Sequence, residues 1–543
     1  MSFRALLFTL LLVNIPSLGA PQNPAPSNDD ACAACHKQIY DSYQQTLMAN
    51  ASGKASDGLV TGDFTHQASG VHYRVFNKDG RTWMSYERTG DATINGQREL
   101  LYYIGSGRKG RSYLFSKEGF LFESPINWYS QEGRWNMAPA YTEAREIPMN
   151  LPARRDCLNC HASGVQSPMP GTENRYDGRP FLHGGVSCER CHGQGTAHAE
   201  GNGPILNPAK LAPERRDAVC MQCHFEATVA IQQPGKHLYD FRPGDELSDY
   251  VHYFLLTGPA TDSVEAVSQT EALALSVCKL KSGDRMSCTS CHDPHFEPAD
   301  ADKAAYFRGK CLACHGEAFG AKHHADKTDC TECHMPKLAS KDVAHTQATD
   351  HQILRRRRLQ IGQPQDADSS RRLIAFPAAL RGKETDRDLG LAWEDLAQHG
   401  VEGASHQAEH YLRLAVNERP DDTVALTALA YIEQEHRKTR DAQELYERVL
   451  QINPLANRAA TDLGVLEAGE GNLRRAAELW RSAFDRAPHR SLIGIDLAIT
   501  FCEAGHVDVA RGYIQRVLEF NPDSAEARSL AKNLNADPVR CKL

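Results

Sequence analysis

Cys188-Glu189-Arg190-Cys191-His192 is one of seven stretches of the form Cys-x-x-Cys-His in this 543-residue chain. The seven motifs comprise Cys32, Cys35 and His36; Cys157, Cys160 and His161; Cys188, Cys191 and His192; Cys220, Cys223 and His224; Cys288, Cys291 and His292; Cys311, Cys314 and His315; and Cys330, Cys333 and His334. With 17 cysteines and 24 histidines in the chain, chance would produce roughly 0.02 such motifs. Two thiols three positions apart can both add to the vinyl groups of one porphyrin, and the next histidine then lies on the proximal side of the iron. The motifs therefore predict seven covalently attached c-type haems, with these seven histidines as iron ligands.

Repeated cysteine pairs also occur in the disulfides of secreted proteins, in zinc knuckles and in thioredoxin-like redox sites. Disulfides and zinc sites do not require a histidine directly after every second cysteine. A redox dithiol occurs once per domain rather than seven times. The spacing thus favours haem.

The N-terminus indicates export from the cytoplasm. Arg4 precedes an apolar core, residues 5–15, of about 11 residues, and small residues follow up to Ala20. A membrane anchor is the alternative, but it would need roughly 20 apolar residues. We therefore expect residues 1–20 to be a signal peptide, the mature chain to have no transmembrane segment, and the protein to be periplasmic or extracellular. The net charge of −8 argues against a nucleic-acid partner.

The composition of residues 30–351 predicts a haem-packed domain of mostly α and irregular structure. The region is rich in Gly, Pro and His and has little helical periodicity, so the porphyrins would supply its apolar interior. Within it, about residues 60–130 predict a small antiparallel β insert, because β-branched and aromatic runs alternate with turn signals. The expected strands are 71–76, 82–87, 99–104, 112–115 and 120–124. Their aromatic residues could form a core or a substrate pocket.

After a predicted linker, residues 352–388, the sequence repeats every 34 residues. Pro420, Pro454, Pro488 and Pro522 keep this interval, as do Ala408, Ala442, Ala476 and Ala510. A 34-residue period with these positions is typical of tetratricopeptide (TPR) repeats, and it predicts an all-α solenoid of about four repeats over residues 389–538. Its groove is expected to dock a redox partner protein. A rigid spacer or a dimerisation arm is the alternative.

Three cysteines lie outside the motifs: Cys278, Cys502 and Cys541. A disulfide between Cys502 and Cys541 and two buried free thiols are both compatible with the sequence.

The sixth ligand of each iron decides between electron transfer and catalysis, because an iron with two protein ligands can only pass electrons. Eleven further histidines lie before residue 352: His66, His72, His183, His198, His237, His252, His295, His323, His324, His345 and His351. These are enough to supply every sixth ligand.

Several stretches resemble a known family. The sequences 185–193 (GVSCERCHG), 288–295 (CTSCHDPH), 333–336 (CHMP) and 349–351 (TDH) are similar to multihaem cytochromes c. They are closest to the c-552 and c-554 group, related to the tetrahaem cytochrome that takes electrons from hydroxylamine oxidoreductase. The resemblance implies bis-histidine haems in close pairs and electron transfer in the periplasm. It implies distal ligands at His183, His198, His295, His324, His345 and His351.

Met48 marks a departure from this resemblance, because related chains often have histidine at its position. A Met48 ligand would raise the potential of the first haem. Met48 could equally be a packing residue, with His66 or His72 as the ligand.

Two functions follow from these patterns. The first is an electron carrier with no catalytic residues, since successive motifs lie only 31, 32, 23 and 19 residues apart within two clusters. The second is an oxidoreductase in which one open haem acts on a small nitrogen or sulfur compound. Multihaem nitrite reductases commonly have lysine in the catalytic motif, whereas all seven motifs here end in histidine.

Overall fold

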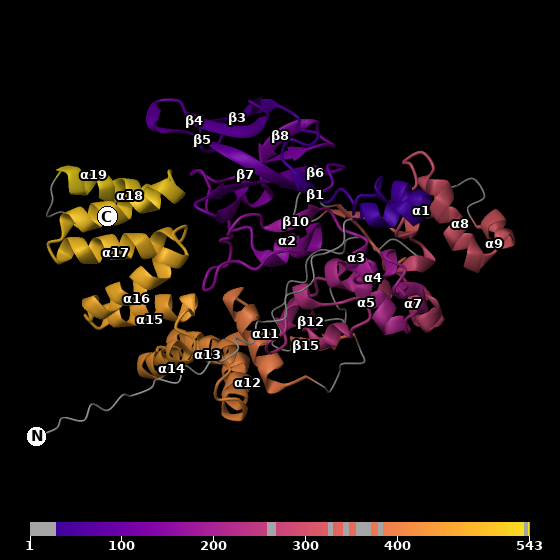
Figure 1. The fold of residues 1–543 in the computed structure, drawn as a ribbon. Coiled ribbons are helices and arrows are strands. Elements are labelled where there is room, and N and C mark those ends of the chain that lie inside the picture. Colours follow the sequence, from indigo (N-terminus) through magenta and orange to yellow (C-terminus); the bar gives the residue numbers. More distant parts are fainter. Residues whose placement is uncertain are drawn as a thin grey trace, which may run out of the picture.

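The computed structural model describes residues 29–257, 268–323, 329–339, 347–354, 371–377, 384–536 and 541. The predicted signal peptide, His324, His345 and most of the predicted linker lie outside these residues. Figure 1 shows an antiparallel sheet, a motif region of short helices, and a helical solenoid that continues to the C-terminus. We define the motif region as residues 29–51 and 138–354.

The sheet is larger than the sequence predicts, with eight strands instead of five. Its order is β2-β3-β4-β5-β6-β7-β8, and β1 pairs with β5. The strands are β1 (Ser52–Lys54), β2 (Gly62–His66), β3 (Val71–Lys78), β4 (Arg81–Arg88), β5 (Asp91–Ile104), β6 (Gly110–Lys117), β7 (Phe120–Tyr129) and β8 (Arg134–Met137). The five predicted strands correspond to β3 to β7.

Many of the aromatic residues of the sheet lie in its core, whereas Trp83 and Tyr102 are only half-buried. Tyr73, Tyr86, Tyr103 and Phe115 are buried in one apolar cluster. Trp135 of β8 donates its Nε1–H to the carbonyl of Val60, which precedes β2, at 3.1 Å. The sheet therefore curls until its first and last strands approach each other.

The motif region contains short helices and small sheets. Its α-helices are α1 (Asp30–Tyr43), α2 (Arg155–His161), α3 (Glu189–His192), α4 (Thr196–Ala199), α5 (Pro213–His224), α6 (Gln269–Leu275), α7 (Val277–Ser282), α8 (Lys303–His315), α9 (Glu317–Lys322) and α10 (Cys330–His334). Two hairpins form from β9 (Ala162–Val165) with β10 (Phe181–Gly184) and from β13 (Lys337–Ala339) with β14 (Gln347–Thr349). In the part of the chain that the structure describes, no helix combines the length and apolarity needed to cross a bilayer.

Part of the predicted linker is a strand instead. β15 (Arg372–Phe376) pairs with β12 (Val251–Thr257), which pairs with β11 (Val229–Gln232). The run Leu373-Ile374-Ala375-Phe376 is apolar and β-branched at Ile374, which suits a strand. Its partner lies more than one hundred residues earlier, so local pattern alone does not identify it.

The solenoid consists of four helix pairs and a last helix, as the 34-residue period predicts. Its helices are α11 (Asp386–Gln398), α12 (Ala404–Glu418), α13 (Thr423–Glu435), α14 (Thr439–Ile452), α15 (Asn457–Gly469), α16 (Leu473–Arg486), α17 (Ser491–Glu503), α18 (Val507–Phe520) and α19 (Ala525–Ala536). The four repeated alanines are fully buried. Gly464 must be small, because a Cβ there would lie 2.4 Å from the Trp480 ring.

Both ends of the solenoid are attached to the rest of the protein. At the first end, α11 shares an apolar cluster with β11, β12 and β15, and Asp388 accepts a hydrogen bond from Gln233 at 3.0 Å. At the other end, Phe520 of α18 packs edge-on against Phe120 and Phe122 of β7. The solenoid is therefore attached to the rest of the protein at both of its ends.

Cys502 and Cys541 form a disulfide, which settles the choice that the sequence leaves open. The bridge joins α17 to the end of the chain across 39 residues. Closing a loop of this length stabilises a fold by about 3–4 kcal/mol in the chain-entropy model.

We expect Cys502→Ser with Cys541→Ser to lower the stability of the last solenoid repeat by up to about 3–4 kcal/mol. Hydrogen exchange of α18 and α19, compared with that of α11 and α12, measures this effect. Cys278→Ser is the control, because Cys278 lies in the motif region. Equal exchange rates in the double variant and the native protein would contradict the prediction.

Candidate haem-binding cavity

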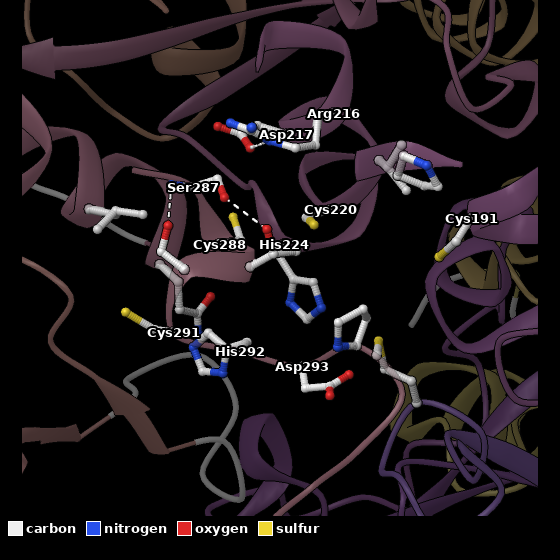
Figure 2. Close-up of a pocket in the computed structure, with 18 of the residues that line it drawn as sticks. Cys191, Arg216, Asp217, Cys220, His224, Ser287, Cys288, Cys291, His292 and Asp293 are labelled. Atoms are coloured by element: carbon white, nitrogen blue, oxygen red, sulfur yellow. Dashed lines mark hydrogen bonds and ion pairs between the residues drawn. The ribbon is translucent and has the colours of Figure 1, made fainter. Parts of the chain in front are cut away.

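One large cavity runs through the motif region, and all seven motifs line it. Figure 2 shows a part of its lining. Each motif contributes its histidine and at least one thiol to the lining. The cavity volume is about 3580 Å³. A pocket for one drug-sized ligand holds about 300–1,000 Å³, so this cavity has room for several groups of porphyrin size.

The local fold explains how each motif faces the cavity. Five helices, α2, α3, α5, α8 and α10, end at the histidine of a motif. Helical residues three positions apart lie on the same face, so the two cysteines of a motif point to the same side. The histidine follows at the point where the chain leaves the helix. In α1, His36 has non-helical backbone angles inside the helix.

Thiols of different motifs approach each other in pairs. Cys32 and Cys188 lie within 4.8 Å of each other beside a carboxylate oxygen of Asp29. The pKa values of three further pairs of thiols are shifted by the closeness of the two partners: Cys160 with Cys223, Cys220 with Cys288, and Cys311 with Cys330. Figure 2 shows Cys220 and Cys288 close to His224. The first motif is thus adjacent to the third, the second to the fourth, the fourth to the fifth, and the sixth to the seventh.

Four pairs of histidines stand at a characteristic spacing. The ring centres are 6.3 Å apart for His36 and His198, 5.9 Å for His192 and His295, 6.3 Å for His292 and His351, and 5.9 Å for His323 and His334. The planes of the rings differ by 12°, 15°, 30° and 29° in the same order. An imidazole nitrogen binds a transition metal at about 2.0 Å, so two imidazoles on opposite sides of one ion have centres roughly 6.3 Å apart. Each pair joins a motif histidine to a second histidine.

Backbone carbonyls orient several of these rings. The Nδ1–H groups of His192, His198, His334 and His351 donate to the carbonyls of Leu206, Gly203, Leu354 and Thr349 at 2.9, 3.1, 2.7 and 2.7 Å. Such a bond fixes the tautomer and leaves the Nε2 lone pair for a metal. Burial lowers the pKa of five cavity histidines, which keeps them neutral at pH 7 and able to coordinate: His161, His224, His292, His295 and His351.

The structure separates the predicted distal ligands into groups. His198, His295 and His351 each face a motif histidine. Met48 lines the cavity, but His198 rather than Met48 stands opposite His36. His183 lies on β10 and does not line the cavity. His324 and His345 lie outside the described residues.

His323 is the site residue that the resemblance missed. It stands opposite His334 from the end of α9, next to the predicted His324. The pattern of adjacent histidines was visible, but local sequence cannot decide which of two neighbours points inward.

Other histidines of this region serve the protein fold. His66 has both ring nitrogens hydrogen-bonded, to Ser69 at 2.8 Å and to the carbonyl of Thr142 at 2.9 Å. His72 lies on β3, with its Nδ1 hydrogen-bonded to Thr65 at 3.1 Å. Neither lines the cavity. Among the described residues, His161, His224 and His315 have no second imidazole at the spacing of the four pairs.

The lining fits flat apolar groups held by thioethers. Large apolar side chains are exposed on it, including Val277 at 65 %, Ile39 at 49 % and Phe296 at 47 %. Exposed apolar surface of this kind marks a binding site. The Nδ1 of His161 is buried without a hydrogen-bond partner. Paired thiols, neutral imidazoles and apolar walls together match the requirements of haem c.

Two parts of the chain match protein families. Residues 130–193 match the family described as "Cytochrome c554 and c-prime", and residues 467–534 match the tetratricopeptide repeat. The first match includes the second and third motifs. The chain therefore contains a region similar to a c-type cytochrome and a repeat region of a kind that binds proteins.

Solved structures similar to part of this chain include MamA proteins and a tetratricopeptide repeat protein. A crystal structure of MamA protein has 19% sequence identity and a TM-score of 0.23, covering 27% of this chain and 76% of its own. A tetratricopeptide repeat protein from Parabacteroides merdae has 18% identity and a TM-score of 0.25, covering 28% and 62%. No curated protein matches the chain.

Proposed function

We propose that this protein is an exported multihaem c-type cytochrome that transfers electrons through seven covalently bound haems. The observation that carries the proposal is the single cavity lined by all seven motifs, with four histidine pairs at the spacing of a bridged iron. The residues 1–20 and the need for an oxidising compartment with haem-attachment machinery support a periplasmic or extracellular location.

The residues of the chain divide the work of holding haem. The motif thiols attach each porphyrin, and the motif histidines supply one iron ligand. His198, His295, His351 and His323 supply the second ligand at the first, third, fifth and seventh motifs. Haem c, when bound, supplies an iron that changes its oxidation state by one electron. Backbone carbonyls hold the imidazoles in place, which favours a low-spin iron in both states.

The contacts between motifs indicate which haems would be neighbours. Motifs whose thiols lie close together would hold adjacent haems: the first with the third, the second with the fourth and the fourth with the fifth, and the sixth with the seventh. Short distances between such neighbours would favour electron transfer within the cavity.

The solenoid is the proposed docking site for a redox partner protein. Val424, Val465 and Leu492 are exposed apolar residues on α13, α15 and α17, the first helices of successive repeats. Exposed apolar side chains on successive repeats are suited to contact a protein segment. Because the solenoid is attached at both ends, it would hold that partner at a fixed position relative to the haems.

A second candidate function is an oxidoreductase with one open haem. It is favoured by the three motif histidines, His161, His224 and His315, that have no paired imidazole among the described residues. The spin state of the native protein separates the two functions. Iron that is entirely low-spin would exclude the open haem, whereas a high-spin fraction that shifts on adding cyanide or nitrite would favour the enzyme.

We expect the mature protein to carry one haem for each motif. Produced in a host able to attach haem c, the protein should exceed the mass of its amino acids by seven haems. Replacing both cysteines of one motif, as in Cys220→Ala with Cys223→Ala, should remove one haem, since the porphyrin then has no attachment point. Intact mass and the haem-to-protein absorbance ratio measure both results.

The control for this prediction is Cys278→Ala. Cys278 lines the same cavity but belongs to no motif, so this variant should keep all seven haems. A colourless native protein with the mass of its amino acids would refute the proposed function.

A further inference from the structure

The β-sheet sends one loop to the edge of the cavity. Residues 105–109, between β5 and β6, contribute Ser106, Arg108 and Lys109 to the cavity lining. Gly105 and Gly107 have φ of 94° and 83°, values that other residues rarely adopt. The loop therefore has a specific shape that these glycines permit.

The sheet also holds this loop from behind. Ser130 donates its hydroxyl to the carbonyl of Gly107 at 2.5 Å and its N–H to the carbonyl of Lys109 at 2.9 Å. Arg111 stacks its guanidinium on the Tyr103 ring, 3.9 Å from the ring centre. The backbone that carries Arg108 is thus anchored on a folded core.

The guanidinium of Arg108 binds two carboxylates of the motif region. One Nη binds Glu297 and the other binds Asp300. Lys303 reaches the same two groups, at 2.9 Å from Glu297 and 3.3 Å from Asp300. Arg108, Lys303 and Glu297 are each about one-third or less exposed, whereas Asp300 is 79% exposed, so the contact of Arg108 with Glu297 is the better shielded part of this network.

The segment fixed in this way carries His295, the histidine opposite His192. Residues 291–302 form no helix or strand, so tertiary contacts must hold them. Ser42 donates to the carbonyl of His295 at 2.7 Å from the side of α1. Arg108 binds two residues further along, at Glu297, from the side of the sheet.

We propose that Arg108 is a positioning residue for His295 as the second iron ligand of the third motif. This inference rests on the proposed function, since it assumes a haem at the third motif. It assigns a role to the β insert: the sheet clamps the loop that carries a ligand. Supporting residues of a metal ligand typically change metal affinity about 10- to 100-fold.

The test compares variants of the full haem-loaded protein by electron paramagnetic resonance and by exogenous imidazole binding. His295→Ala should make one haem of seven high-spin. Arg108→Ala should make that same haem high-spin in a fraction of the molecules. Added imidazole should bind this haem at least about 10-fold more tightly than it binds the native protein. Arg108→Lys keeps the positive charge but loses the two-pronged guanidinium that binds both carboxylates. This variant should give a smaller effect than Arg108→Ala.

Arg81→Ala is the matched control, since Arg81 forms an ion pair with Glu99 on the same sheet and does not line the cavity. It should leave all haems low-spin. If His295→Ala produces a high-spin haem but Arg108→Ala does not, the role of Arg108 is refuted while the proposed function stands. If His295→Ala itself leaves every haem low-spin, the ligand assignment and the role of Arg108 both fail.

Discussion

Replacement of His198 by alanine is expected to convert one haem in seven from low-spin to high-spin while all seven remain attached. His198 stands 6.3 Å from His36, ring centre to ring centre, with the planes almost parallel. Its Nδ1–H is held by the carbonyl of Gly203, so the other nitrogen is aimed by the backbone. Loss of this ring leaves one axial position of the first haem to water or another weak ligand. Electron paramagnetic resonance measures the spin state, and intact mass shows that the thioethers are unaffected.

His237→Ala provides the control for this experiment. His237 lies in the same region, but its Nδ1 is hydrogen-bonded to Gln232 at 2.9 Å and it does not line the cavity. Its replacement should leave the spectrum unchanged. If His198→Ala also leaves the spectrum unchanged, then the spacing of ring centres does not identify iron ligands, and the other three pairs lose their support.

Asp523→Asn is expected to detach the C-terminal end of the solenoid from the sheet. The Asp523 side chain is 2% exposed and binds Arg88 of β4 through both oxygens. It also accepts from Arg528 at 3.0 Å and from the backbone N–H of Ile147 at 3.0 Å. Removing one partner of a buried ion pair costs about 3–5 kcal/mol, because here the Arg88 guanidinium would stay largely buried without its carboxylate partner.

Chemical denaturation, followed by hydrogen exchange of α18 and α19, measures this loss. Asp508→Asn is the control, because Asp508 pairs with Arg511 in the same repeat but its side chain is 97% exposed. An exposed substitution of this kind changes stability by about 0.5 kcal/mol or less. Equal effects of the two substitutions would show that the buried contact contributes nothing.

The solenoid was the most predictable part of the fold. Its signal is local and repeated, so four prolines and four alanines identify the helix pairs, and the observed helices run from residue 386 to 536 against a predicted 389 to 538. The central strands were also predictable, since tight turns connect neighbours in sequence. β1 and β15 were not, because β1 pairs with β5 and β15 with β12 through contacts between distant segments.

The candidate site divides in the same way. The motif residues follow from spacing within five positions of the chain. The opposite histidines come from elsewhere: His198 follows the third motif but faces the histidine of the first, and His351 follows the seventh but faces that of the fifth. Such pairing depends on how short helices pack, which no local pattern encodes. The choice between His323 and His324 depends on the end of one six-residue helix.

The attachment of α11 affects whether the solenoid can be produced as a separate fragment. Repeat arrays ordinarily need a polar terminal unit, because an uncovered outer face is sticky. Here the first helix, α11, is covered by the apolar side chains of Val229, Phe254 and Ala375. These residues take the place of a polar terminal unit. Residues 384–541 made alone would expose this face to water and self-associate. The boundary between the motif region and the solenoid is therefore a shared apolar interface, so separating the two segments would expose apolar surface on both.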